Sequence, residues 1–573
     1  METKKITNAL MLTSSLCSLG FISSACSNSN SSKKKMNILY IMCDDLTSQA
    51  IGAYGSRLAT LNPTPVIDKE LAANGIVFDD CFDVNSISTP SRANILTGQY
   101  SHTNGVLTLD EALMPCQEYL PMEMKQLGYT TAMIGKWHQH CEPSAFDYYQ
   151  VLIGHGGQGT YFDPEFCTNE VKGKYPNNTK KYTGHVTKNI ADITLDWLKN
   201  KRDKSKPFFL MHHFKAPHDN FEFAPEYKDY LADVDIPMPK TLFNRKGFGS
   251  IATRGANDSL VNRIGTSVSN RHLFRNYVQM YKINTGNDSL DTKMAYNEYL
   301  KRYLRCVKGV DDQLKRIFDY LKENKLWDNT IIIITGDQGM MLGEHDLQDK
   351  RWMYEESMRM PFIVRVPGMK NAGTHNDQLV CNVDFAPTLL SLAGENETPR
   401  YMQGYDFSPI LYGKKTKYTH EAIYYRYWMH MIHHDVPAHF GIRTKDYKLI
   451  FFYGRHYDPS RYGERTMVWE KWGESNLIEP TPAAFELYDM KNDPHETTNL
   501  ANNPKYAKVL ADLKQQLLAL KAKVGDSDTS NPEIQKVINE NFKEFSTNTQ
   551  DAKRFPKKYA KIKKDDWKLS HKK

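Results

Sequence analysis

Long hydrophobic runs are scarce in this sequence of 573 residues. The only long apolar stretch is N-terminal, and this excludes a membrane protein with several spanning helices. Apolar residues account for 40% of the chain and charged residues for 25%, which provides ample apolar material for a large core. The composition therefore excludes wholesale disorder and is typical of a globular protein.

Cysteine is also scarce, with nine residues in the chain. Cys17 lies in the apolar N-terminal stretch and Cys26 follows that stretch, while the other seven are scattered without C-x-x-C pairs. An odd, scattered set predicts neither a disulfide framework nor a zinc site. We expect most of these cysteines to be small, buried apolar residues.

Positive charge is concentrated at the two ends of the chain. The net charge is +7, of which residues 1–35 contribute +4 and residues 553–573 contribute +8, so the body between them is near −5. A body of this sign has no overall attraction for polyanions, so we expect no nucleic-acid partner. Any anion that it binds must be held by local groups. The basic tail at 546–573 is interpreted as a solvated charged segment, with association to a surface as the alternative.

The first residues have the pattern of an export signal. A basic start precedes an apolar and small-residue stretch at 6–22, which is too short for a comfortable transmembrane helix. Cys26 then closes a segment that resembles a bacterial lipoprotein cleavage box, and residues 27–35 form a polar linker. We therefore predict a signal peptide with a lipobox at 1–26. The expected product is a lipoprotein in the periplasm or attached to the outer membrane of a Gram-negative bacterium, with the lipid anchor as its only membrane contact. Ordinary signal cleavage is the alternative.

Short apolar runs alternate with helical patterns along the body of the chain. The runs lie at 37–42, 131–134, 208–211, 331–335 and 362–366, and apolar residues at helical spacing occupy 295–321. This alternation predicts an α/β fold with a large doubly wound, mixed or parallel sheet flanked by helices, over residues 36–415. Polar residues follow the ends of several runs, namely Asp44-Asp45, Lys136, His212–His218 and Asp337. In open sheets of this kind the ligand lies beyond the carboxyl ends of the strands, so these segments are expected to converge on one site.

Two further regions differ in composition from the rest of the body. Residues 240–292 are polar and are predicted to be an insertion. After residue 415 a strand-like alternation at 441–450 and an amphipathic helix at 509–520 predict a smaller α+β subdomain over 416–545.

The segment from Ser88 to Gly98 reads Ser-Thr-Pro-Ser-Arg followed by small and apolar residues and Thr-Gly. This pattern resembles the signature of the sulfatase family, within the alkaline-phosphatase-like superfamily. Three further stretches are similar to that family and occur in the expected order, at 128–138, 336–361 and 486–500. Four matches in order make this a specific resemblance, which covers about residues 36–520.

The resemblance implies that Ser88 is oxidised by a formylglycine-generating maturase to Cα-formylglycine, an aldehyde that hydrates to a gem-diol. The sulfate ester of a plain serine would be hard to hydrolyse. A gem-diol retains a second hydroxyl, whose deprotonation expels sulfate and restores the aldehyde, so covalent catalysis turns over. The alternative for Ser88 is an N-cap serine at a helix start near Pro90.

Oxygen ligands for a metal ion follow two of the predicted strands. Asp44, Asp45, Asp337 and Gln338 offer carboxylates and a carbonyl, and residue 88 is predicted to be a further ligand, a set that suits calcium first and magnesium second. Family members usually have Asn or His at the position of Gln338, which keeps a carbonyl oxygen. A strand-end turn and a helix entry are the alternatives for these two segments.

The catalytic roles are implied by family position. Arg92 holds the geometry of residue 88, while Lys136 and Lys350 contact sulfate oxygens. His138 is the expected base for the second diol hydroxyl. His218 is the expected general acid at the leaving sugar oxygen, in a role shared with Lys350, because imidazole can donate or accept near neutral pH.

Aromatic and basic residues are dense between 424 and 439. Arg426, His434 and His439 are predicted to bind substrate there, because the segment resembles the loop that completes the sugar pocket in some carbohydrate sulfatases, including N-acetylglucosamine-6-sulfatase-like members. Residues 146–149 and 157–162 are predicted to contribute to the same sugar pocket. A capping strand packed on the core is the alternative.

The expected function is hydrolysis of sulfate esters on sulfated saccharides of glycosaminoglycan or mucin type, exo-acting. The first candidate substrate is 6-O-sulfated hexosamine, and the alternatives are sulfated galactose or N-acetylgalactosamine and 2-O-sulfated uronate. One rival is a phosphate or phosphonate monoester hydrolase of the same superfamily, which would use a two-metal site. The other is a catalytically silent lipoprotein that binds sulfated glycans because Ser88 is never oxidised.

Overall fold

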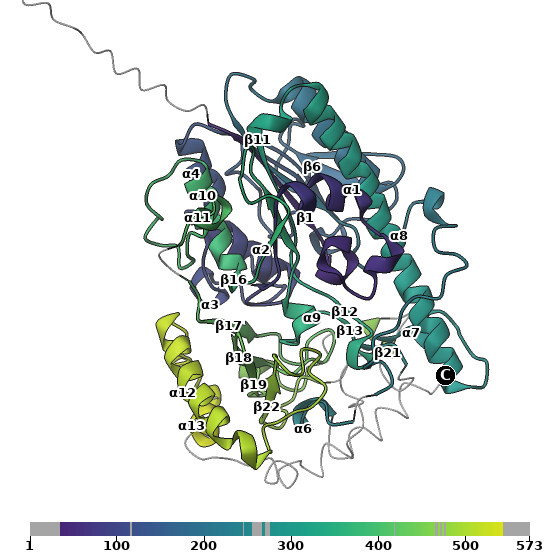
Figure 1. The fold of residues 1–573 in the computed structure, drawn as a ribbon, viewed down its shortest axis with the longest axis vertical. Coiled ribbons are helices and arrows are strands. Elements are labelled where there is room, and N and C mark those ends of the chain that lie inside the picture. Colours follow the sequence, from purple (N-terminus) through teal and green to yellow (C-terminus); the bar gives the residue numbers. More distant parts are fainter. Residues whose placement is uncertain are drawn as a thin grey trace, which may run out of the picture. The chain divides into compact units, whose positions relative to one another are not determined.

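The computed structural model describes residues 35–114, 117–244, 246–254, 266–269, 275–416, 419–464, 468–469, 473–474 and 477–542 (Figure 1). The predicted signal peptide and lipobox (1–26), the linker (27–35) except Lys35, and the basic tail (546–573) lie outside these residues. None of the helices within the described ranges is both long enough and apolar enough to span a membrane.

The apolar runs form the middle of a large mixed sheet. Its ten strands occur in the order β15 (Thr374–Asn376), β2 (Ile76–Phe78), β14 (Phe362–Arg365), β11 (Thr330–Gly336), β1 (Asn37–Cys43), β8 (Phe208–Phe214), β4 (Thr130–Gly135), β5 (Tyr148–Leu152), β6 (Glu165–Thr168) and β7 (Thr179–Lys181). The run from β11 to β5 is parallel, whereas β14 pairs antiparallel with β11. The predicted α/β class with a mixed sheet is confirmed.

Helices cover both faces of this sheet, because the side chains of its central strands alternate between two cores (Figure 1). On β1, Leu39 and Ile41 join one core, and Tyr40 and Met42 join the other. The first core is covered by α1 (Pro65–Glu70), α5 (Val186–Asp196) and α8 (Asp288–Glu323). The second is covered by α2 (Ser88–Thr97), α4 (Leu120–Gln126) and α10 (Phe385–Leu392).

Helix α8 confirms the helix predicted at 295–321 but begins earlier. The side chain of Asn287 accepts a hydrogen bond from the Leu290 amide and caps the helix, so α8 starts at Asp288. The insertion predicted at 240–292 therefore overlaps the helix at its end, which is a correction. Within that insertion, residues 245, 255–265 and 270–274 lie outside the described residues.

A second, antiparallel sheet follows the large one. It consists of β17 (Ala422–Tyr427), β18 (His439–Thr444), β19 (Tyr447–Phe452) and β22 (Ala484–Asp489), with α12 (Ala507–Lys523) and α13 (Pro532–Phe542) packed on it (Figure 1). The strand alternation predicted at 441–450 falls on two strands, because a turn at Lys445-Asp446 separates β18 from β19. The helix predicted at 509–520 is confirmed as α12.

Short elements connect these layers. They are β3 (Cys81–Phe82), α3 (Ser101–Asn104), α6 (Ile251–Arg254), β9 (Thr266–Ser267), β10 (Arg275–Asn276), α7 (Tyr277–Met280), β12 (Met341–Leu342), β13 (Gln348–Asp349), α9 (Glu355–Met358), β16 (Val380–Cys381), α11 (Ser408–Leu411), β20 (Val468–Trp469) and β21 (Gly473–Glu474).

A buried ion cluster fastens the last two helices to the small sheet. Arg426 on β17 is 2% exposed, and its two terminal nitrogens lie 2.7 Å from carboxylate oxygens of Asp526 and Asp528, in the link between α12 and α13. Lys521 of α12 lies 2.8 Å from Asp528. Burial alone would raise the pKa of Asp526, but Arg426 and Lys521 hold that pKa well below its usual range.

Replacing Arg426 should show how much this ion cluster contributes to the free energy of unfolding. In Arg426→Met two buried carboxylates lose their main partner, and we expect a loss of about 3–5 kcal/mol in the free energy of unfolding at pH 7. Because the folded pKa values of Asp526 and Asp528 are depressed, the stabilisation is present above their unfolded pKa and is lost as the pH falls through the folded values. The difference between wild type and variant should therefore be largest near neutral pH and shrink as the pH falls below about 4, measured by chemical denaturation between pH 7 and pH 2.

The matched control is Lys188→Met on α5, which removes an exposed pair with Asp192 and should cost at most about 1 kcal/mol. An Arg426→Met deficit that does not change with pH would contradict the electrostatic explanation and leave only lost packing.

Candidate active site

Four neighbouring parallel strands of the large sheet end at one edge. The register pairs Cys43 at the end of β1 with Gly336 of β11 and Phe214 of β8, and Gly135 of β4 with His213 of β8. The chain segments that leave these ends carry the predicted site residues, which are Asp44-Asp45, Asp337-Gln338, Lys136 with His138, and His218. These segments therefore meet at the carboxyl edge of the sheet, as the sequence predicted.

Helix α2 places the candidate nucleophile against this edge. The helix begins at Ser88 after extended Ile87, and the Ser88 hydroxyl donates a hydrogen bond of 3.2 Å to Oδ1 of Asp44. One turn later Arg92 donates from Nε and Nη2 to Oδ2 of Asp337, at 3.1 and 2.9 Å. The helix thus holds residue 88 and a guanidinium at a fixed distance from two carboxylates that belong to different strands.

Two lysines complete the positive lining of the site. The Lys136 ammonium donates to Oδ2 of Asp44, and Lys350 Nζ lies 2.7 Å from Oδ2 of Asp45. Burial lowers the pKa of Lys136 to about 8 even though Asp44 opposes the shift. Burial would also lower the pKa of Lys350, but Asp45 and Asp349 raise it above its usual value. Both side chains are therefore cationic at neutral pH.

The carboxylates form a donor set that fits a hard divalent cation. Burial and the neighbouring Asp44 raise the pKa of Asp337 to about 6, as expected for acids that repel each other away from water. Oε1 of Gln338 is buried without a hydrogen-bond partner in the described part of the chain, while its amide nitrogen donates to Asp45. Asp44, Asp45, Asp337 and Gln338 would hold the cation, since crowded carboxylates and a free carbonyl oxygen are the ligands that calcium and magnesium prefer.

His218 and His138, the two predicted catalytic histidines, have different surroundings. Nδ1 of His218 lies 2.8 Å from Oδ1 of Asp219 and 2.7 Å from its carbonyl oxygen, while Nε2 faces Oδ2 of Asp45 at 3.8 Å. Burial together with Lys136 and Arg92 lowers the pKa of His138 well below its usual range, so this ring is neutral. Its Nδ1 has no hydrogen-bond partner among the residues that the structure describes. The contacts of Nδ1 in His218 thus turn Nε2 of that ring toward Asp45, and Nδ1 of His138 stays open as a hydrogen-bonding position.

A cavity of about 310 Å³ opens beside these groups. It is lined by His155, Gln158, Gly159, Thr160, Tyr161, Lys215, His218, Asp219, Asn220 and Glu222. Oε1 of Gln158 lies 3.3 Å from Lys136 Nζ, and the Lys215 ammonium lies 5.0 Å from the centre of the Tyr161 ring. Sequence reasoning did not select Lys215 or Asp219 as site residues, although both flank His218 after the end of β8 and that position was the available signal.

The residues predicted to bind sugar divide into two groups. His434 lies close to the site, because its Nδ1 is 2.5 Å from Oδ2 of Asp349, the residue before Lys350. Arg426 is committed to the buried ion cluster of the small sheet. His439 is fully buried on β18 and its ring stacks on Tyr425 at 5.6 Å. The described contacts of these last two side chains include none of the catalytic candidates, so the alternative of a packed capping strand describes them better.

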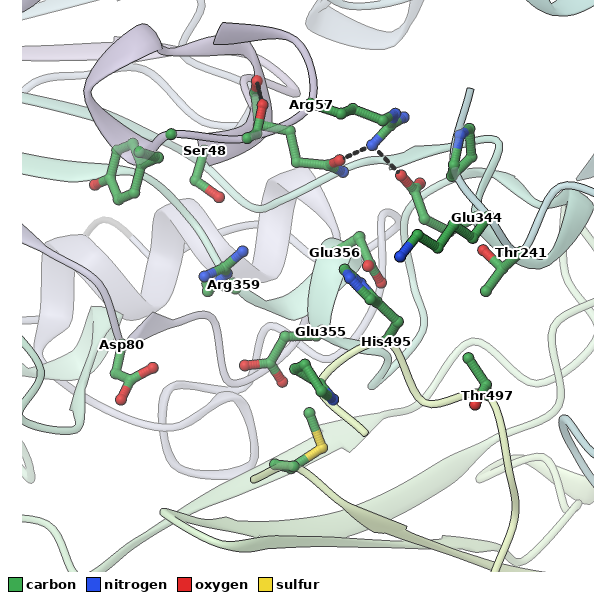
Figure 2. Close-up of a pocket in the computed structure, with 18 of the residues that line it drawn as sticks. Ser48, Arg57, Asp80, Thr241, Glu344, Glu355, Glu356, Arg359, His495 and Thr497 are labelled. Atoms are coloured by element: carbon green, nitrogen blue, oxygen red, sulfur yellow. Dashed lines mark hydrogen bonds and ion pairs between the residues drawn. The ribbon is translucent and has the colours of Figure 1, made fainter. Parts of the chain in front are cut away.

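A second, larger cavity of about 640 Å³ lies apart from these residues (Figure 2). Figure 2 shows Arg57 reaching Glu344, at 2.6 Å, with Glu355, Glu356 and Arg359 around the same space. Its lining combines both signs of charge and contains none of the catalytic or metal-binding candidates. We therefore place the reaction at the strand ends and not in this cavity.

Comparison with known proteins agrees with this geometry. The profile of the sulfatase family matches residues 36–395. The chain belongs to the sulfatase family. A second profile, described as the C-terminal part of N-sulphoglucosamine sulphohydrolase, matches residues 343–462 of this sulfatase. The predicted family is confirmed, and the protein is a sulfuric ester hydrolase; sulfatases generally use a formylglycine and a divalent metal ion.

Individual relatives are similar over most of the sulfatase. An N-acetylglucosamine-6-O-sulfatase of Bacteroides thetaiotaomicron is 36% identical over 535 residues, which cover 87% of this chain and 88% of that protein. A solved structure in complex with its substrate D-glucosamine-2-N,6-O-disulfate matches with a TM-score of 0.72 and 35% identity, over 87% of this chain and 100% of that one. Phosphonate monoester hydrolase of Agrobacterium radiobacter shares the fold, with a TM-score of 0.60 and 20% identity over 86% of this chain and 96% of that one.

Removing the free carbonyl oxygen of Gln338 should weaken cation binding by this sulfatase. In Gln338→Met the side chain keeps its length but loses its oxygen, so we expect the affinity for Ca²⁺ or Mg²⁺ to fall about tenfold or more. The measurement is calorimetric titration of chelator-treated protein. Gln49→Met, which changes a buried amide in the second cavity, is the matched control and should leave the affinity unchanged. Equal affinities for wild type and Gln338→Met would remove Gln338 from the ligand set.

Proposed function

We propose that this sulfatase removes the 6-O-sulfate group from a sulfated glucosamine at the end of a saccharide chain of glycosaminoglycan or mucin type. The observation that carries the proposal is that Ser88 Oγ lies 3.2 Å from Asp44, in a cluster where Arg92 pairs with Asp337, Lys136 with Asp44 and Lys350 with Asp45. His218, whose Nε2 faces Asp45 at 3.8 Å, lines a cavity of about 310 Å³. A space of this size suits one sugar unit and so favours exo action. The relatives named for glucosamine 6-sulfate chemistry support the choice of sugar.

The cofactors in this proposal are calcium, with magnesium as the second choice, and a formylglycine at position 88 that a maturase makes from Ser88. When present at position 88, a hydrated formylglycine would supply two hydroxyl groups, one as nucleophile toward sulfur and one to release sulfate, and a cation held by Asp44, Asp45, Asp337 and Gln338 would stabilise negative charge on the attacking oxygen. The burial of Asp44, Asp45 and Asp337 excludes water from the place where these groups act.

In this proposal the side chains of the protein have separate catalytic roles. Lys136 and Lys350 bind sulfate oxygens and stabilise the negative charge that develops on them. Nδ1 of His218 donates to Asp219, which orients the ring so that Nε2 can deliver a proton to the leaving sugar oxygen. His138 is neutral and accepts the proton of the second hydroxyl at residue 88.

The wall of the cavity gives the sugar its contacts. Lys215 offers a buried ammonium to an anionic substituent, and Asp219 and Glu222 offer acceptors for hydroxyl groups. His434 contacts Asp349, which is the residue before Lys350 and also pairs with Lys350. In this proposal His434 either orients Lys350 or contacts the sugar directly.

We further propose that the enzyme is exported and carries a lipid on Cys26, which attaches it to the outer membrane or the periplasmic side of a Gram-negative cell. The support is the basic start, the apolar stretch and the position of Cys26 in the sequence. Metabolic labelling with palmitate is expected to mark the wild type and not Cys26→Ser; an unlabelled wild type would remove the anchor.

A panel of defined sulfated saccharides tests the substrate. With matured enzyme, in which peptide mass analysis shows the loss of two hydrogens at Ser88, we expect sulfate release from 6-O-sulfated glucosamine and little from 2-O- or 4-O-sulfated sugars. Protein that lacks this modification should be inactive. Equal activity of unmodified protein, or faster turnover of an aryl phosphate than of an aryl sulfate, would contradict the proposal.

The proposed acid makes a prediction about leaving groups. His218→Ala should lower kcat on a sugar sulfate by about 10²–10⁴-fold, but much less on an aryl sulfate whose phenolate leaves without a proton. Lys136→Ala should lower kcat by about 10²–10³-fold on both, because it acts on the sulfate group. His375→Ala, at an exposed histidine paired with Asp79, is the control and should match wild type. An equal loss on both substrates for His218→Ala would remove it as the acid.

A further inference from the structure

Three metal-binding side chains that the catalytic site does not use meet near the junction of the two sheets. Cys381 ends β16, Asp384 follows it before α10, and His420 lies just before β17. Their ligand atoms lie within 4.8 Å of one another. Cys381 and Asp384 are buried, and the side chain of His420 is 11% exposed.

The distances between the three ligand atoms match the coordination shell of zinc. Cys381 Sγ lies 3.6 Å from His420 Nε2 and 3.4 Å from Asp384 Oδ2, and Nε2 lies 2.8 Å from that same oxygen. A tetrahedral Zn²⁺ with ordinary bond lengths separates sulfur from nitrogen or oxygen by about 3.5 Å, and nitrogen from oxygen by about 3.3 Å. Only the nitrogen–oxygen pair, now joined by a hydrogen bond, has to open by about 0.5 Å to admit the ion.

The surroundings hold these ligands in place. Asp384 accepts the backbone amides of Cys381 at 2.9 Å and Tyr405 at 2.8 Å, so its carboxylate has a fixed orientation. The Tyr405 ring packs on the His420 ring with 4.7 Å between centroids. Supports of this kind around the ligands are what makes a metal site selective for one geometry.

The arrangement does not suit nucleophilic catalysis. A Cys–His–Asp relay needs the thiol and the carboxylate on opposite nitrogens of the imidazole. Here the same atom, Nε2 of His420, faces both Cys381 and Asp384.

We propose that Cys381, Asp384 and His420 form a zinc site, separate from the hard-cation site of the active centre. A thiolate, an imidazole and a carboxylate are a borderline-soft set that zinc prefers over calcium or magnesium. Binding displaces the thiol proton to solvent, and the imidazole binds through Nε2 with its remaining proton on Nδ1. Water takes the fourth position. The ion ties the end of β16 to the segment that enters the small sheet, which is a structural role.

Cobalt substitution of the full chain tests the proposal. Chelator-treated protein is titrated with Co²⁺, and a cobalt–thiolate bond produces a near-ultraviolet charge-transfer band together with the visible bands of tetrahedral cobalt. We expect one equivalent of Co²⁺ to produce these bands and Zn²⁺ to displace it. The oxygen ligands of the active centre produce no thiolate band, so this readout is independent of catalysis and of the modification at residue 88.

Variants assign the band to its ligands. Cys381→Ser should abolish the charge-transfer band, and His420→Ala should weaken binding at least tenfold. Cys306→Ser, at another buried cysteine, is the matched control and should keep the band. Zinc should raise the thermal midpoint of wild type and Cys306→Ser by several degrees but not that of Cys381→Ser. A wild type without the band, or a band that persists in Cys381→Ser, would overturn the proposal; because the wild-type titration alone can do so, the test does not depend on the variants folding.

Discussion

The active centre depends on keeping several buried carboxylates together. Asp44, Asp45 and Asp337 follow the ends of adjacent strands, and two unit charges about 4 Å apart near a protein surface repel by about 4 kcal/mol. Arg92, Lys136 and Lys350 offset this repulsion in the structure. These are also the side chains that a sulfate group would need. In the proposed function the carboxylates coordinate a cation, and the ammonium groups become available to the substrate.

Much of the site could be predicted from sequence because its carboxylates follow directly after buried strands. A strand buried on both faces has to be a continuous apolar run, and the first polar residues after it, such as Asp44-Asp45 and Asp337-Gln338, therefore lie at the sheet edge. The position of Ser88 was indicated by the resemblance of its segment to a known signature and not by its environment. The antiparallel direction of β14 was not predictable, because pairing direction depends on contacts far away in sequence. The start of α8 is set by a local cap, in which Asn287 accepts from the Leu290 amide, and that signal was missed.

The sugar-binding predictions show where residue patterns fail. Arg426 and His439 lie in a segment rich in aromatic and basic residues, and such a segment can describe either a sugar pocket or the core of a small sheet. Only the folded structure shows that Arg426 pairs with Asp526 and Asp528, in the link between the last two helices. Conversely, Lys215 and Asp219 line the cavity although they lie outside the segment at 424–439 that was predicted to bind sugar, since the turn after β8 brings them there.

The cysteines illustrate the same limit for metal sites. The spacing of Cys381, Asp384 and His420 follows no motif, so a reading of cysteine spacing alone predicts no zinc site, whereas the fold brings these ligands together. Cys43 shows the opposite case, because it directly precedes Asp44 and could be mistaken for a ligand of the active centre. Strand alternation directs its side chain into the core, and burial raises the pKa of its thiol above the usual value. A thiolate there would favour zinc over a hard cation, so the inward direction of Cys43 preserves the oxygen character of the catalytic donor set.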